Sequence, residues 1–118
     1  MNIEYLRDYC LSKKAVTESF PFDETTLVFK VANKMFALSG LDNIPFKVNL
    51  KCDPERAIAL REAYECIQPG HHMNKQLWNT VSPTEGLTAS FFTELIDHSY
   101  DLIVASLPKK TRVEFGFS

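Results

Sequence analysis

The junction between a strand and a helix at residues 46–55 constrains the fold of this chain more than any other segment. Apolar and polar residues alternate from Phe46 to Lys51, which is the pattern of a strand with one buried face. Asp53, Pro54 and Glu55 follow as an acidic N-cap, a proline at the first helical position and a carboxylate in the first turn. The junction therefore predicts a sheet with helices on one face and polar side chains on the other.

Hydrophobic periodicity elsewhere predicts two further helices and three further strands. A hairpin is expected where two β-rich segments flank Ala32 and Asn33, since Asn tolerates a positive φ angle. The expected elements are the helices Asn2–Lys13, Asp53–Glu65 and Ala89–Leu107, the strands Thr26–Val31, Lys34–Leu38, Phe46–Lys51 and Leu77–Val81, the loop Ser82–Leu87 and a cationic tail after Pro108. This order predicts one α+β domain over residues 1–118, a two-layer sandwich with an antiparallel sheet and helices on one face.

The composition fits a single cytoplasmic domain. The chain has 118 residues, of which 45% are hydrophobic, and this is enough to bury one core. Its three cysteines lie far apart without a CxxC pair, the first residues do not resemble a signal peptide, and no stretch is as apolar as a membrane span. We expect a cytoplasmic protein, a monomer or small homo-oligomer, that makes no membrane contact.

The segment Pro69–Val81 has the most unusual composition in the chain. It combines two histidines, several amide side chains, a lysine and the only tryptophan. Lys47, Asn49 and Lys51 lie on the expected polar face of the preceding strand. If the two regions converge, they form a cationic surface with amide donors and an aromatic ring, which suits contact with phosphates and bases.

The chain also resembles a known family along most of its length. The matching stretches are FPFDETTLVFKV, KMFALS, VNLKCDPERAIALREAYE, PGHHMNKQLWNTV and ELIDHSYDLIVASLPKK. They are similar to the MmcQ/YjbR family of small proteins described as DNA-binding. The resemblance implies a two-layer domain with a central antiparallel sheet, similar to type III secretion chaperones, and a double-wing mode of DNA binding.

We therefore expect a non-catalytic binding module whose partner is nucleic acid, most simply DNA. A formal net charge of −2 argues against binding by bulk charge and requires a local basic patch. The predicted nucleic-acid-binding residues are Lys47, Asn49, Lys51, His72, Asn74, Lys75, Trp78, Lys109 and Lys110. Trp78 either stacks on a base or belongs to the core, and the usual burial of tryptophan favours the core. Lys109 and Lys110 either touch phosphate or cap the last helix.

Other interpretations of single residues remain open but are weaker. His71 and His72 near Cys66 could bind a metal, yet their spacing matches no common zinc site. Cys52 precedes a helix start, where a thiol can become nucleophilic, yet no histidine and acid accompany it in a recognisable pattern.

Two acidic features have equally simple structural explanations. Asp23 and Glu24 precede a strand and suit a turn, and His98 beside Asp97 does not face it on a helix. We expect no enzyme activity, no metal and no cofactor. The alternative function is a protein-interaction module that docks partners through Phe115 and Phe117 or an open sheet edge.

Overall fold

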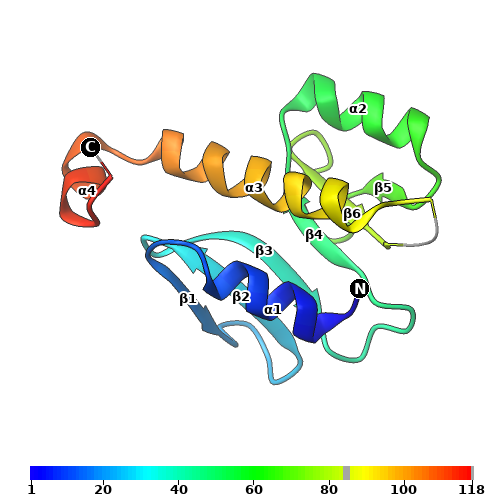
Figure 1. Ribbon diagram of the computed structural model, residues 1–118, viewed down its shortest axis with the longest axis horizontal. Helices are drawn as coiled ribbons and strands as arrows, with labels where there is room; N and C mark the ends of the chain where they lie inside the picture. Colours follow the sequence, from blue (N-terminus) through cyan, green and yellow to red (C-terminus); the bar gives the residue numbers. More distant parts are fainter. Residues whose placement is uncertain (84–85, 118) are drawn as a thin grey trace.

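A six-stranded antiparallel sheet, ordered β1-β2-β3-β4-β6-β5, forms one layer of the protein (Figure 1). The computed structural model describes residues 1–83 and 86–117. The strands are β1 Val16–Ser19, β2 Thr26–Val31, β3 Lys34–Gly40, β4 Val48–Lys51, β5 Ile67–Pro69 and β6 Trp78–Val81. The helices are α1 Ile3–Leu11, α2 Pro54–Ala63, α3 Ala89–Ser106 and α4 Lys109–Glu114. The predicted α+β architecture with helices on one face of an antiparallel sheet is confirmed.

The local signals in the sequence produce the predicted boundaries where they are strongest. Ala32 and Asn33 both have positive φ angles, 48° and 70°, and form the tight turn between β2 and β3. Asp53 caps α2 by accepting a hydrogen bond from the Arg56 backbone N–H. Pro54 then occupies the first helical position.

The helices and one face of the sheet enclose a single large core. Alternate strand residues such as Phe29, Val48 and Leu50 point into it and meet side chains from α1, α2 and α3, including Leu6 and Leu60. All five of these side chains are buried. Burial of this apolar layer is the main stabilising term for the two-layer arrangement.

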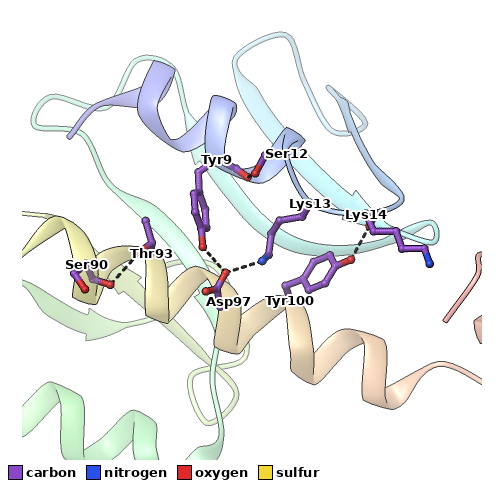
Figure 2. Close-up of polar contacts among 8 residues, drawn as sticks. All are labelled: Tyr9, Ser12, Lys13, Lys14, Ser90, Thr93, Asp97 and Tyr100. Atoms are coloured by element: carbon purple, nitrogen blue, oxygen red, sulfur yellow. Dashed lines mark hydrogen bonds and ion pairs between the residues drawn. The ribbon is translucent and has the colours of Figure 1, made fainter. Parts of the chain in front are cut away.

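Polar contacts join α1 to α3 above this core (Figure 2). The Tyr9 hydroxyl donates to an Asp97 carboxylate oxygen at 2.7 Å, and the Lys13 ammonium approaches the same oxygen at 2.6 Å. Burial and the neighbouring Asp97 raise the pKa of Tyr9 to about 12, so the phenol remains a donor. Tyr100 adds a third link by donating to the Lys14 carbonyl at 2.6 Å.

Several elements differ from the sequence prediction. The edge strands β1 and β5 were not predicted, and β4 begins at Val48 rather than Phe46. The expected cationic tail is instead the short helix α4, after which Phe117 packs on the core. The predicted loop Ser82–Leu87 includes residues 84–85, which lie outside the described part of the chain. Within the described residues, no helix has both the length and the apolar character required to cross a membrane.

A candidate binding pocket on the open face of the sheet

The face of the sheet opposite the helices, here called the open face, changes in character from one side to the other. Cross-strand partners share a face, and one row runs through all six strands. The row consists of Ser19, Val28, Leu38, Asn49, Thr80 and Gln68. It is apolar over β2 and β3 and polar over β4, β6 and β5.

Residues 70–77, here called the 70–77 loop, fold back over the polar part of this row. The His71 backbone N–H donates to the Thr80 hydroxyl at 2.9 Å, and the Asn49 amide donates to the His71 carbonyl at 3.2 Å. The Thr80 hydroxyl in turn donates to the Asn49 amide oxygen. The latch made by these three residues fixes the start of the loop on the sheet, and His72 follows with a φ angle of 58°.

The 70–77 loop and the open face together form a pocket of about 720 Å³. Its floor comes from the sheet, and its walls come from the 70–77 loop and from the connections that follow β1 and β3. The lining residues include Phe22, Asp23, Met35, Leu38, Asn43, Lys47, Asn49, His71, His72, Met73, Asn74 and Thr80. A volume of this size is typical of pockets that bind small molecules.

The pocket brings together four of the predicted binding residues. Lys47, Asn49, His72 and Asn74 all line it. The Lys47 carbonyl accepts a hydrogen bond from the Ser39 hydroxyl at 2.6 Å, which fixes the point where this lysine leaves the sheet. The convergence of β4 with the histidine-containing segment, which the sequence analysis left as a condition, is therefore present for these four residues.

Trp78 is placed differently from the stacking role in the predicted site. Its side chain is only 7% exposed and packs with Val28 and Leu38 on the open face, under the partly buried Met73 and Leu77. The core alternative is thus the one the structure adopts, because the 70–77 loop covers the indole ring. The indole does not present a face for stacking.

The remaining predicted lysines are distributed over two regions. Lys51 lies directly opposite Trp78 on the open face and is not among the residues that line the pocket. The Lys75 ammonium donates to the Gly70 carbonyl at 3.1 Å and so stabilises the 70–77 loop. Lys109 and Lys110 lie on α4, beyond the end of α3 and at the opposite end of the long axis from β5 and β6 (Figure 1). The structure does not bring them to the pocket.

The aromatic residue that the sequence analysis missed is Phe22. It lines the pocket and is 64% exposed. The connection that carries it is fixed by Asp23, whose carboxylate accepts the backbone N–H groups of Thr25 and Thr26 at 2.9 and 2.6 Å. These hydrogen bonds lower the pKa of Asp23 and confirm its turn role. A pair of phenylalanines around Pro21, just before the Asp23-Glu24 turn, was the available signal.

The alternative chemical sites gain no support from the geometry. Burial raises the pKa of the Cys52 thiol to about 11, so it is not a thiolate at neutral pH. Residues 1–83 and 86–117 contain no cluster of three or more His, Cys, Asp or Glu side chains suited to a metal ion. The His98 ring accepts the Asp53 backbone N–H at 3.2 Å and therefore supports the start of α2.

Known proteins match this chain in both sequence and structure. The protein YjbR of Escherichia coli K12, which is uncharacterised, is 34% identical over 113 residues, or 95% of each chain. The uncharacterised protein YbdF of Escherichia coli O157:H7 is 39% identical over 92 residues, covering 77% of this chain and 75% of its own.

Two crystal structures share the fold. Deinococcus radiodurans protein DR2400, described with the domain DUF419, matches with a TM-score of 0.93 and 37% identity over 99% of this chain and 89% of its own. A structural genomics target from Pseudomonas syringae matches with a TM-score of 0.73 and 28% identity over 86% of this chain and 98% of its own. A family model described as YjbR also matches residues 11–102. The resemblance detected in the sequence is therefore confirmed, and the chain belongs to the YjbR family.

Proposed function

We propose that this chain is a non-catalytic module that binds nucleic acid, DNA in the first instance, through the open face of its sheet. The observation that carries the proposal is the position of Lys47 in the lining of a pocket on that face, with Lys51 on the same face of the sheet, opposite Trp78. Lys30 adds a third cation to the same face, opposite Met35. Ammonium groups at such positions act as point charges for phosphate oxygens.

The distribution of charge between the two layers supports this orientation. The strands carry Lys30, Lys34 and Lys51, whereas their acid, Glu18, is paired with Arg7 at 2.5 Å. On α1, α2 and α3 the acidic residues outnumber the basic ones; these acids are Glu4, Asp8, Glu55, Glu62, Glu94, Asp97 and Asp101. The net charge of −2 therefore combines an acidic excess on α1, α2 and α3, which repels phosphate, with a cationic excess on the strands, which attracts it.

Salt dependence gives the first test. If Lys30, Lys47 and Lys51 each engage one phosphate of duplex DNA, the logarithm of the binding constant should fall with the logarithm of salt at a slope of about −2.7. Fluorescence anisotropy of labelled DNA over a salt series measures this slope. A folded protein that binds neither duplex nor single-stranded DNA at low salt would refute the proposed function.

A matched pair of variants locates the surface. The variant with Lys47→Glu and Lys51→Glu reverses two charges on the open face, and we expect at least about a tenfold loss of affinity from the lost counterion release and the new repulsion. The control with Lys109→Glu and Lys110→Glu makes the same change in net charge on α4. Equal losses in both variants would mean that bulk charge, not the open face, determines binding.

A second candidate, docking of a protein partner, is favoured by exposed apolar side chains at one end of the sheet. Ile44 is 95% exposed, and Leu41 and Phe20 are 46% and 47% exposed on the connections that follow β3 and β1. Exposed apolar side chains grouped in this way are a common feature of interaction sites. An Ile44→Asp variant that loses a defined protein complex, while DNA binding by the wild type is absent, would favour this candidate.

A further inference from the structure

We propose that the pocket on the open face receives an unpaired nucleobase, stacked on Phe22, and that the preferred ligand is single-stranded rather than duplex nucleic acid. This inference rests on the proposed function and specifies its ligand. It assigns to Phe22 the stacking role that the buried Trp78 does not fill.

Phe22 places an exposed aromatic ring at the wall of the pocket. An aromatic side chain that is 64% exposed at the wall of a pocket leaves apolar surface in water, which is unfavourable without a ligand. The backbone beside it is ordered by the Asp23 hydrogen bonds and by the Leu41 N–H, which donates to the Thr25 carbonyl at 2.7 Å. Because this connection is ordered already, stacking on Phe22 requires little further loss of conformational entropy.

The lining of the pocket has an apolar part and a polar part, which together suit a nucleobase. Leu38, Met35 and Met73 provide an apolar floor and wall suited to the flat face of a base. Asn43 provides an amide group beside it, and Asn74, whose amide oxygen accepts the Gln76 backbone N–H at 2.9 Å, adds an NH₂ group; both suit hydrogen bonds with a base edge. This combination of apolar contact and a few polar groups is typical of pockets that select a planar heteroaromatic ligand.

Side chains of both charges, Lys47 and Asp23, line the pocket. Lys47 lines it, and Lys51 lies on the same face of the sheet outside the lining, so the phosphates that flank an inserted base would meet cations. Asp23 also lines the pocket, and its carboxylate repels phosphate. The same carboxylate is directed at the backbone N–H groups of its own turn, which offset its charge locally. The sugar-phosphate backbone of the bound nucleic acid is therefore expected to pass on the side of the pocket that carries Lys47.

The concave shape of the pocket favours a single strand over a duplex. The bases of a duplex are stacked and paired, so one of them enters a pocket only after flipping, which has an energetic cost. A single strand presents the faces of its bases without that cost, and aromatic stacking tolerates any base. A duplex lying across the lysines would leave the pocket empty and Phe22 in water.

The test compares three fluorescently labelled ligands of about 12 nucleotides, a length within the usual span of single-strand sites: an oligothymidylate, the same strand with abasic positions, and a hairpin duplex. The abasic strand keeps the phosphates and lacks bases. We expect the oligothymidylate to bind most tightly. Duplex or abasic binding as tight as that of the oligothymidylate would overturn the inference while leaving the proposed function intact, whereas absence of binding to all three ligands would overturn both.

Variants of two neighbouring phenylalanines assign the stacking residue. We expect Phe22→Ala to weaken binding of the oligothymidylate by about 5- to 150-fold and to leave binding of the abasic strand unchanged. The control is Phe20→Ala, because Phe20 is 47% exposed on the same connection and is not among the residues that line the pocket. Equal effects of Phe22→Ala on both strands, or no effect on either, would overturn the assignment.

Phe22→Trp gives an independent readout. A tryptophan at this exposed position should retain binding, and its emission should be quenched when a base stacks on it. Trp78 is buried under the 70–77 loop and serves as the constant background, which is measured in the wild type. Binding of the oligothymidylate without quenching in this variant would contradict stacking at residue 22.

Discussion

The two faces of the sheet are made from alternate residues of the same strands, yet they are used in opposite ways. In β4, Leu50 enters the core between sheet and helices, while its neighbour Asn49 faces the other side and holds the 70–77 loop. Because strand side chains alternate, selection for packing on one face leaves the other face free to vary. Within the four residues of β4, one face thus packs in the core and the other faces the proposed binding site.

Polar groups follow the same division. On the helical side, the buried Ser99 hydroxyl donates to the Phe36 carbonyl at 2.5 Å and accepts the Lys51 backbone N–H at 2.9 Å. Such a group satisfies backbone atoms in the interior and faces no solvent. On the open face, Asn43 and Asn74 line a pocket instead. The first kind of polar group satisfies the interior; of the second kind, Asn74 still accepts the Gln76 backbone N–H, and its NH₂ group lies at the pocket.

The largest effect that distinguishes the two faces is expected from paired truncations of phenylalanine. Phe29 is fully buried on the helical side, and Phe29→Ala should lower the free energy of unfolding by about 3–5 kcal/mol through lost burial and a cavity. Phe22→Ala on the open side should change it by less than about 0.5 kcal/mol, because its side chain is mostly exposed. Urea unfolding followed by circular dichroism measures both.

A Phe22→Ala variant that is as unstable as Phe29→Ala would contradict this difference between the two faces. That result would mean that the connection carrying Phe22 contributes to the core, and the loss of ligand binding in this variant could then be explained by unfolding. The expected outcome is a variant with native stability and reduced binding, which is the reverse of a core mutation.

The next largest effect should come from the packing of the 70–77 loop on the open face. A Cβ atom at Gly70 would lie 2.8 Å from the Trp78 Cβ and 2.9 Å from the Trp78 carbonyl oxygen, so the loop must move to accommodate it. We expect Gly70→Ala to destabilise the protein by about 1–3 kcal/mol, and to shift the emission of Trp78 as the covering loop is displaced.

Gly86→Ala is the matched control for that variant. A Cβ atom at Gly86 meets no heavy atom within 4 Å, so the same substitution should have little effect there. Tryptophan emission reports specifically on the surroundings of Trp78 during unfolding, since Trp78 is the only tryptophan of the chain. Equal destabilisation by the two substitutions would show that loss of glycine flexibility, and not the contact with Trp78, is responsible.

Sequence patterns predicted the helical side of the fold better than the open side. The alternation within residues 46–51 and the Asp53-Pro54 start of α2 depend on neighbours in sequence; the structure has the first over Val48–Lys51 and the second as predicted. The edge strands Val16–Ser19 and Ile67–Pro69 have four and three residues, too few for a periodic signal. Their existence depends on pairing with β2 and β6.

The candidate site was predicted in part for the same reason. Strand alternation placed Lys47 and Asn49 on one face, and composition singled out His72 and Asn74, but that all four line one pocket is seen only in the structure. The burial of Trp78 follows from a tertiary contact of the 70–77 loop that no local pattern encodes. The position of Lys109 and Lys110 likewise depends on the length of α3, which carries α4 away from the pocket (Figure 1).

The smallest expected effect is a pH dependence that belongs to the helical side. Partial burial of His98, and then the positive charge of Arg56, lower the pKa of this histidine from its usual 6.5, against the opposing effects of Glu94, Asp53 and Asp101. Protonation also removes the lone pair that accepts the Asp53 backbone N–H. Between the folded and unfolded pKa values the unfolded chain binds more protons, so the contribution of His98 to stability is complete above about pH 6.5 and decreases as the pH falls below it.

His98→Gln keeps an acceptor but does not titrate. The stability difference between wild type and variant should therefore shift in favour of the variant by about 0.5 kcal/mol or less between about pH 7.5 and about pH 5.5. The shift is small because a side chain that is largely solvated is strongly screened. Urea midpoints at the two pH values measure this shift. A difference that stays constant, or moves in favour of the wild type at low pH, would show that the neutral form of His98 is not the one that supports the start of α2.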